Sequence, residues 1–399
     1  MINDSENISY IINILGENDT DQVSPVTPPI YQTSNFYFKT VEQFRQAISD
    51  EKENLIYSRG NNPTINLLCR KLAALEGADE ALAFGSGMAA ISSAILANVK
   101  TGDHLVCVRN PYSWTNTLLN TNILPKFGVQ VTMADGRNTD EIISAVRPET
   151  TVIYLESPNS WTFEIQDLKA ISSFARERGI VTIIDNTYST PLFQQPIKSG
   201  IDLVVHTASK YLGGHSDVVA GVVCGSGTLM QKIFANEFLT LGGIISPFNA
   251  WLILRGLRTL PVRMEHVSRV TQQVLSYLKT QPKIKHIYYP MLAENDQYAL
   301  AASQMAKGTG LFTIEADSTP EAIEAFCNSL TYWRMAVSWG GFESLVIPSC
   351  TFVRPGLYST LPPTLIRFSV GLEDAETLIS DIDRNIHLLT SPKKPLQII

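Results

Sequence analysis

The 399-residue sequence lacks the features of several large classes of protein. It has no excess of basic residues, since 31 Lys and Arg against 38 Asp and Glu give a net charge of −7. This balance argues against nonspecific nucleic-acid binding and against attachment to an anionic membrane surface. No apolar run is long enough to span a bilayer, and the first residues lack the basic and then apolar pattern of a signal peptide. A cytoplasmic location is therefore expected by default.

Cysteine is scarce, which bears on disulfides and metals. The five cysteines are odd in number and widely scattered, and no two of them have the spacing of metal ligands. They are expected to be small buried hydrophobic residues in a reducing compartment. The six histidines are equally dispersed, without a His-x-x-x-His pair. No metal site is predicted.

Apolar strand patterns alternate with helical ones along much of the chain. This alternation predicts a mainly parallel sheet covered by helices on both faces, and the length allows two or three domains. The expected strands are 80–84, 104–108, 129–133, 151–155, 181–184, 202–205 and 220–223, followed after a gap by 311–314, 336–339 and 365–370. The expected organisation is an arm over 1–60 that contacts a neighbouring subunit, an α/β domain over 61–256 and a smaller α+β domain over 257–399, with a hinge at 255–261.

The stretch 202–216 carries the main candidate for chemistry. An apolar strand ends in Thr207 and Ser209, and then come Lys210 and two glycines. A lysine just after a buried strand is desolvated, so its amine tends to lose its proton and become a nucleophile. Lys210 is thus a candidate Schiff-base lysine for pyridoxal phosphate (PLP), although many lysines after strands are solvated surface residues.

A second candidate lies at residues 80–90. A short strand runs into Gly85-Ser86-Gly87-Met88 and then into a helix of small residues. Strand, glycine turn and helix together direct backbone N–H groups at a phosphate, but an isolated Gly-x-Gly also forms an ordinary tight turn.

Three further residues suit a cofactor or a substrate. Asp185 ends an apolar strand, and a carboxylate there needs a cation such as a pyridinium nitrogen, unless it caps a helix or a turn. Tyr112 could stack on an aromatic ring, or belong to the core or the rim. Arg367, between apolar neighbours, suits a substrate carboxylate or a structural salt bridge such as one with Glu373.

With these residues assembled, the chain resembles the Cys/Met-metabolism (trans-sulfuration) family of fold-type I PLP enzymes, from Pro29-Ile30-Tyr31-Gln32-Thr33 to the segment 367–374. The resemblance implies an aspartate-aminotransferase-like fold, a PLP-binding domain at 61–256 and a homo-oligomer, typically a tetramer built from two dimers. It also implies that Lys210 holds PLP as a Schiff base and shuttles the substrate's α-proton, and that Asp185 pairs with the pyridine nitrogen. The remaining implied roles fall into four groups: Gly87, Met88, Thr207 and Ser209 for the phosphate; Tyr57 and Arg59 for the phosphate of the neighbouring subunit; Tyr112 for the cofactor ring and proton transfer; Arg367 with Ser338 and Trp339 for the substrate carboxylate.

The sequence leaves the reaction within this family open. Ser160 stands where γ-type enzymes usually have the Asn of Asn-Pro, and Trp339 stands where they usually have Leu, so both resemble cystathionine β-lyases. The segments 57–64 and 246–247 resemble the γ-enzymes instead. The favoured hypothesis is α,β-elimination on cystathionine or a related cysteine conjugate. The alternatives are γ-elimination, γ-replacement on an activated homoserine, and a catalytically silent member, which the presence of Lys210 and Asp185 argues against.

Overall fold

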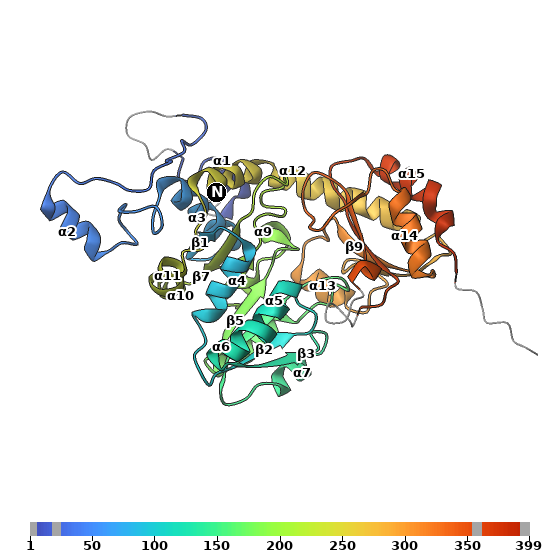
Figure 1. Ribbon diagram of the computed structural model, residues 1–399, viewed down its shortest axis with the longest axis horizontal. Helices are drawn as coiled ribbons and strands as arrows, with labels where there is room; N and C mark the ends of the chain where they lie inside the picture. Colours follow the sequence, from blue (N-terminus) through green and yellow to red (C-terminus); the bar gives the residue numbers. More distant parts are fainter. Residues whose placement is uncertain (1–5, 18–24, 353–360, 392–399) are drawn as a thin grey trace, which may run out of the picture. The chain divides into compact units, whose positions relative to one another are not determined.

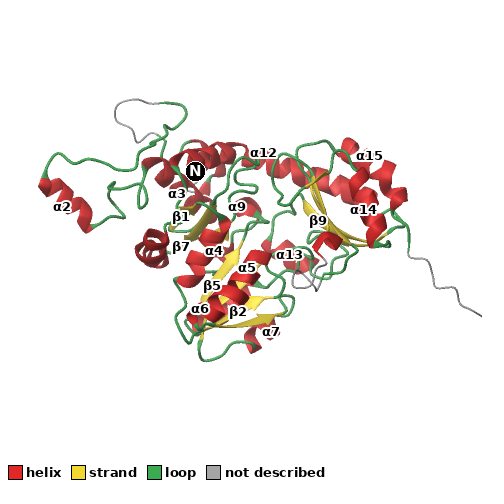
Figure 2. Ribbon diagram, in the orientation of Figure 1, coloured by secondary structure: helices red, strands yellow, loops and turns green. Residues whose placement is uncertain are grey.

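The computed structural model describes residues 6–17, 25–352 and 361–391. These residues divide into two compact units, one comprising 1–158 and 165–260 and the other 159–164 and 261–399. Figures 1 and 2 show a sheet in each unit, and the units are described separately here. Across the described ranges, no helix combines the length and the apolar character that crossing a membrane requires.

The first unit contains a seven-stranded sheet in the order β1-β7-β6-β5-β4-β2-β3. All neighbouring pairs are parallel except the two that involve β7, so the expected mainly parallel sheet is confirmed. The strands are β1 (Glu80–Phe84), β2 (His104–Val108), β3 (Gln130–Ala134), β4 (Thr150–Glu156), β5 (Val181–Asp185), β6 (Leu203–His206) and β7 (Gly221–Gly225).

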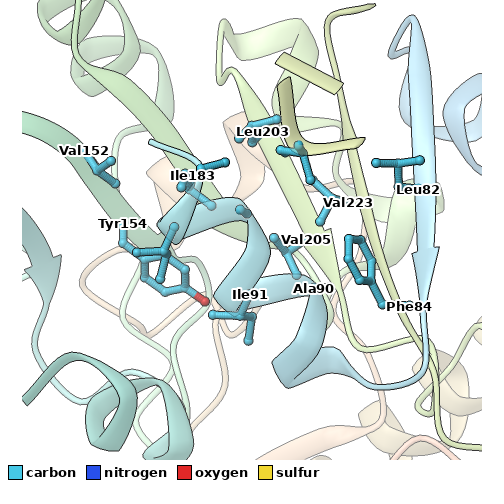
Figure 3. Packing of buried hydrophobic residues seen from close by; sticks show 14 of the residues in the cluster. Leu82, Phe84, Ala90, Ile91, Val152, Tyr154, Ile183, Leu203, Val205 and Val223 are labelled. Atoms are coloured by element: carbon cyan, nitrogen blue, oxygen red, sulfur yellow. The ribbon is translucent and has the colours of Figure 1, made fainter. Parts of the chain in front are cut away.

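Helices cover both faces of this sheet because its apolar residues alternate between two cores. Along β4, Val152 and Tyr154 join one core, and Ile153 and Leu155 join the other. Figure 3 shows the first core, in which Ala90 from α4 lies near Val205 of β6. The helices of the unit are α3 (Pro63–Glu76), α4 (Gly87–Leu96), α5 (Ser113–Thr117), α6 (Leu124–Phe127), α7 (Thr139–Ser144), α8 (Leu168–Glu177), α9 (Thr190–Phe193), α10 (Gly227–Ile233), α11 (Leu239–Leu241) and the first part of α12 (Pro247–Leu278).

The segment before α3 carries two short helices, α1 (Ile8–Asn13) and α2 (Val41–Ser49). Thr40 caps α2 by accepting the N–H of Gln43. Several apolar side chains around α2 are exposed, among them Tyr37 at 88% and Val41 at 73%. Such exposure is typical of a surface that another chain covers.

The second unit contains a five-stranded sheet in the order β10-β11-β12-β9-β8, antiparallel except for β10 with β11. On one face, the rings of Phe312, Phe368 and Trp333 pack together, and the Trp333 indole donates to the carbonyl of Leu378 in α15. The elements are β8 (Ile284–Tyr288), β9 (Leu311–Ala316), β10 (Arg334–Met335), β11 (Leu345–Pro348), β12 (Leu365–Ser369), α13 (Tyr298–Gln304), α14 (Pro320–Ser329) and α15 (Ala375–Asn385).

Two sequence expectations about elements need correction. The division between the two units falls within 255–261, where the change of domain was expected, but this segment is helical throughout, because α12 continues through it with Pro261 inside it. Leu257, Leu260 and Met264 recur at helical spacing and are fully buried. Gly256 allows close packing, since an added Cβ would overlap the backbone carbonyl of Gly213.

The expected strand at 336–339 is wrong. Only Arg334–Met335 joins the sheet, as β10, because Ser338 has a φ of +85° and the chain leaves the extended conformation there. Of the five cysteines, all free, Cys107, Cys224 and Cys327 are buried as expected, and the other two are partly exposed.

Candidate active site

The amino terminus of α4 forms a cradle at the end of β1. Ser86 caps the helix by accepting the N–H of Ala89 at 3.0 Å, and the N–H groups of Gly87 and Met88 belong to the first turn, where a helix supplies no acceptors. Gly87 lies directly against the side chain of Thr207, so that an added Cβ would overlap its Oγ1. Of the four residues expected at a phosphate, the structure therefore brings Gly87, Met88 and Thr207 together.

Ser209 and Lys210 follow β6 in a tight turn. The N–H of Lys210 donates to the carbonyl of Thr207 at 3.1 Å. The Ser209 hydroxyl donates to the carbonyl of Ala220 at 3.2 Å and accepts the Ala220 N–H at 3.0 Å. Both hydrogen bonds of this hydroxyl join Ser209 to Ala220, which directly precedes β7. They hold in place the backbone next to Lys210.

Asp185 ends β5 and is only 7% exposed. One of its oxygens accepts both the N–H of Thr187, at 2.9 Å, and the Thr187 hydroxyl. Burial raises the pKa of the Asp185 carboxyl, while the Thr187 hydrogen bonds and the nearby charges of His206 and Lys210 oppose this rise. A buried carboxylate is stabilised when another cation binds beside it.

Tyr112 lies at the amino terminus of α5, where its backbone N–H donates to Oε2 of Glu156 at 2.6 Å. Tyr112 is 40% exposed, so part of this residue is accessible to solvent. Glu156 is buried at the end of β4, directly opposite Asp185 in the strand pairing. The hydrogen bond from Tyr112 to Glu156 therefore anchors this tyrosine beside the Asp185 strand.

Tyr57 and Arg59 lie in the segment before α3. The guanidinium carbon of Arg59 is 5.6 Å from the centroid of the Tyr57 ring, and Tyr57 forms an antiparallel bridge with Asn35. The structure thus places the two residues together. Their expected action on a neighbouring subunit stays a prediction.

Four expected residues lie in the second unit. Arg367 is at the centre of β12, opposite Thr313, and its guanidinium carbon lies 4.9 Å from the centroid of the Trp161 ring. Glu373, the alternative partner considered for Arg367, accepts the N–H and the hydroxyl of Ser344. The segment with Ser338 and Trp339 is attached to the same strand, since Gly340 N–H donates to Oγ of Ser369 at 3.3 Å. Ser160 lies in the loop 159–164, next to Trp161.

Sequence reasoning missed a buried polar network that includes Asn186, the residue after Asp185. Glu76, at the end of α3, accepts from Nε2 of His206 at 2.5 Å and from Nδ2 of Asn186 at 3.1 Å. Asn186 in turn contacts Gln194 through two hydrogen bonds. Polar residues at the ends of apolar strands, such as His206 and Glu156, could have been flagged by the rule that selected Asp185. Glu76 gives no such signal, because 130 residues separate it from His206.

The residues of the first unit fit PLP. A phosphate suits the cradle at Gly87 and Thr207, a pyridinium nitrogen suits the buried Asp185 carboxylate, and an aldehyde suits an amine at Lys210. A metal ion has less support, since no three His, Cys, Asp or Glu side chains within the described ranges are arranged to hold one.

Comparisons with known proteins agree with this set of residues. The model of a family described as "Cys/Met metabolism PLP-dependent enzyme" matches residues 10–387. An L-methionine gamma-lyase from Porphyromonas gingivalis is 38% identical over 90% of this chain and 92% of its own length. A cystathionine beta-lyase from Lactococcus lactis is 36% identical over 92% of this chain and 96% of its own. The crystal structure of a cystathionine gamma synthase from Xanthomonas oryzae superimposes with a TM-score of 0.89 at 30% identity, covering 96% of this chain and 98% of that one.

Proposed function

Because the chain belongs to the Cys/Met metabolism family of PLP-dependent enzymes, with pyridoxal 5′-phosphate as cofactor and the fold-type I architecture, we propose that it is a carbon–sulfur lyase acting by α,β-elimination on cystathionine or a related cysteine conjugate. The products are a thiol, pyruvate and ammonia. The observation that carries the assignment as an active lyase is the presence, in one unit, of Lys210 and the buried Asp185 carboxylate, whose raised pKa the charge of Lys210 opposes.

Each residue of the first unit has a proposed role. When bound, PLP supplies an electron sink for the negative charge that develops at the α-carbon of the substrate. Asp185 would keep the pyridine nitrogen protonated, and the α4 amino terminus with Thr207 would bind the phosphate. The Lys210 amine would remove the α-proton and later return a proton, and the thiolate would leave from the β-carbon. Tyr112 would hold the ring in place and assist proton transfer.

The second unit supplies the residues proposed to bind the substrate carboxylate. Arg367 presents a planar fork of N–H donors, which matches a carboxylate. The segment at Ser338 and Trp339 adds backbone donors, and Ser369 fixes this segment on the strand that carries Arg367. Arg367 therefore selects α-amino acids with a free carboxylate.

The choice of β- over γ-elimination rests on two positions. Ser160 and Trp339 resemble cystathionine β-lyases rather than γ-type enzymes. A γ-reaction also requires a second proton to be taken from the β-carbon, which demands a different reach from Lys210 or Tyr112. γ-Elimination is the second candidate, because relatives such as the Porphyromonas gingivalis protein are named L-methionine gamma-lyases. The third is γ-replacement, as the name of the Xanthomonas oryzae synthase suggests.

We also propose that the enzyme works as a homo-oligomer, with the tetramer as the expected form. The exposed apolar side chains of Tyr37, Val41 and Ile48 support a covering second copy. Tyr57 and Arg59, at the end of the same segment, would then act on the phosphate of the neighbouring subunit.

The identity of the keto acid tests the reaction. The holoenzyme is incubated separately with L-cystathionine, with L-methionine, and with an activated homoserine plus cysteine, and the products are identified by mass spectrometry. Pyruvate with homocysteine from cystathionine is the expected result. 2-Oxobutyrate from either substrate would establish γ-elimination instead, and a new thioether from an activated homoserine and cysteine, without keto acid, would establish γ-replacement.

A further inference from the structure

The loop 159–164 places an indole ring under the candidate carboxylate-binding arginine. Both Trp161 and Arg367 belong to the second unit, and the guanidinium carbon lies 4.9 Å from the ring centroid. This distance is within the range of a cation–π interaction, in which a guanidinium lies over the electron-rich face of a ring.

The backbone of this loop is held in a conformation that its residues disfavour. Trp161 has a φ of +72° and Phe163 a φ of +55°, which is unusual for bulky aromatic residues. Hydrogen bonds close the loop, since the N–H of Asn159 donates to the carbonyl of Glu164 at 3.1 Å and the N–H of Glu164 donates to Oδ1 of Asn159 at 3.0 Å. Strain of this kind persists where the surroundings enforce it and is concentrated at functional sites.

The indole itself is fixed in place. Its side chain is only 5% exposed and packs with Ile347 and Leu365 from β11 and β12. The ring of Phe352 meets it edge-on, at 6.0 Å and 81°. The guanidinium thus lies on a rigid surface formed from a separate part of the chain, while its own strand is held between β9 and β11.

We propose that Trp161 is a positioning residue that holds the Arg367 guanidinium flat, so that its N–H edge faces the substrate carboxylate. The inference rests on the proposed role of Arg367 in binding the substrate carboxylate, and it adds Trp161 as a residue that supports this role. A long arginine side chain loses rotamer freedom when it binds a ligand, and a platform that orders it beforehand removes part of that loss. Because Trp161 acts through Arg367, whose proposed ligand is the carboxylate, Trp161 affects discrimination between acids and uncharged analogues.

The test compares an amino-acid substrate with its carboxamide, which lacks the negative charge. For the holoenzyme carrying Trp161→Leu, KM for the acid is expected to rise roughly tenfold, with kcat nearly unchanged and the carboxamide kinetics within about twofold of wild type. Trp161→Phe retains a weaker ring face and should raise KM about threefold. The matched control is Trp333→Phe, which alters another buried indole of the same unit that packs against Phe368 and is expected to leave the acid-to-amide ratio unchanged.

The outcomes separate this inference from the role of Arg367 itself. If Arg367→Ala abolishes the preference for the acid while Trp161→Leu keeps it, Trp161 is not a positioning residue and the carboxylate role stands. If Arg367→Ala leaves the preference intact, the carboxylate role is wrong. Should Trp161→Leu fail to fold, Trp161→Phe decides, and an unchanged ratio in that variant overturns the inference.

Discussion

Glu156 and Asp185 occupy directly paired positions at the carboxyl ends of β4 and β5. Their carboxylates have different partners: Glu156 accepts the backbone N–H of Tyr112, and Asp185 accepts two donors from Thr187. Two buried carboxylates on neighbouring strands repel each other unless each is separately satisfied. We therefore expect the two carboxylates to have different functions: Asp185 binds the cofactor, and Glu156 holds Tyr112 in position.

The first prediction concerns the pH dependence of the apo-protein. Because burial raises the pKa of Asp185 above its ordinary value of 3.8, the folded state binds this proton more tightly than the unfolded chain. The contribution of Asp185 to stability is therefore greatest at low pH and declines as the pH rises from about 4 through the raised pKa. Asp185→Asn cannot titrate at this position, so it does not lose stability in this way. As the pH rises from about 4 through the raised pKa, the melting temperature of the variant should therefore increase relative to that of wild type.

The same pair of proteins tests the role of Asp185 toward the cofactor. With PLP bound, the pyridinium supplies a cation to the carboxylate, and the pH-dependent difference should shrink. The kcat of Asp185→Asn should fall by about a hundredfold or more, as for other preorganised electrostatic groups. A melting difference that decreases with rising pH would mean that the fold lowers the pKa of Asp185, contrary to the prediction.

The second prediction concerns Glu156. Glu156→Ala removes the acceptor of the Tyr112 N–H and should lower kcat/KM by about ten- to a hundredfold, because small displacements of catalytic groups are costly. Glu156→Gln keeps an acceptor oxygen and should retain activity within severalfold. Steady-state kinetics on both holoenzymes, with PLP content measured by absorbance, distinguish this role from loss of cofactor. Equal losses in the two variants would show that the charge of Glu156, and not the hydrogen bond, is what matters.

The sequence was sufficient to predict the strands of the first sheet and most of the residues at its carboxyl edge. Apolar strand patterns are local, which is why the strands were predictable, whereas the grouping of Gly87 with Thr207 came from the resemblance to the family, and the structure places these two residues in contact. The partners of those residues were not predictable, because contacts such as Glu76 with His206 join segments far apart in the chain. The helical conformation of 255–261 was not predicted, because Gly256 serves close packing, a use of glycine that a single sequence does not distinguish from flexibility.

The third prediction tests the phosphate cradle. In Gly87→Ala the new methyl group would overlap the Thr207 side chain, so one of the two must move. Titration of the apo-protein with PLP, followed by absorbance, should give a dissociation constant raised at least about tenfold. The control is Gly227→Ala in the first turn of α10, where the added Cβ meets its nearest atom, Oε1 of Glu80, at 3.4 Å. Unchanged affinity in Gly87→Ala would place the phosphate elsewhere.

The fourth prediction concerns stability. Glu76 is fully buried, and removing it leaves His206 and Asn186 without their acceptor. Glu76→Ala should therefore lower the free energy of unfolding by about 3–5 kcal/mol, as for other broken buried pairs, and Glu76→Gln by less. Urea denaturation measures both. Lys52 with Glu80 is a more exposed pair, and Glu80→Ala should cost about 1 kcal/mol or less. Similar losses in Glu76→Ala and Glu80→Ala would contradict this view of the network.

The last prediction asks whether the segment before α3 acts on a second copy of the chain. Arg59→Ala and Lys210→Ala should each be inactive alone. If Arg59 completes the site of the neighbouring subunit, a dimer containing one of each variant has one intact site, formed by Lys210 of one protomer and Arg59 of the other. Half of randomly assembled dimers are mixed, so coexpression should restore about a quarter of wild-type activity.

The control for this experiment pairs Lys210→Ala with Asp185→Ala. Both residues belong to the same unit of one chain, so every site in a mixed dimer lacks one of them, and no activity should return. Recovery with Arg59→Ala but not with Asp185→Ala can arise only if Arg59 acts across a subunit boundary. No recovery in either mixture would place Arg59 with the Lys210 of its own chain, and the exposed apolar side chains around α2 would then require a different partner.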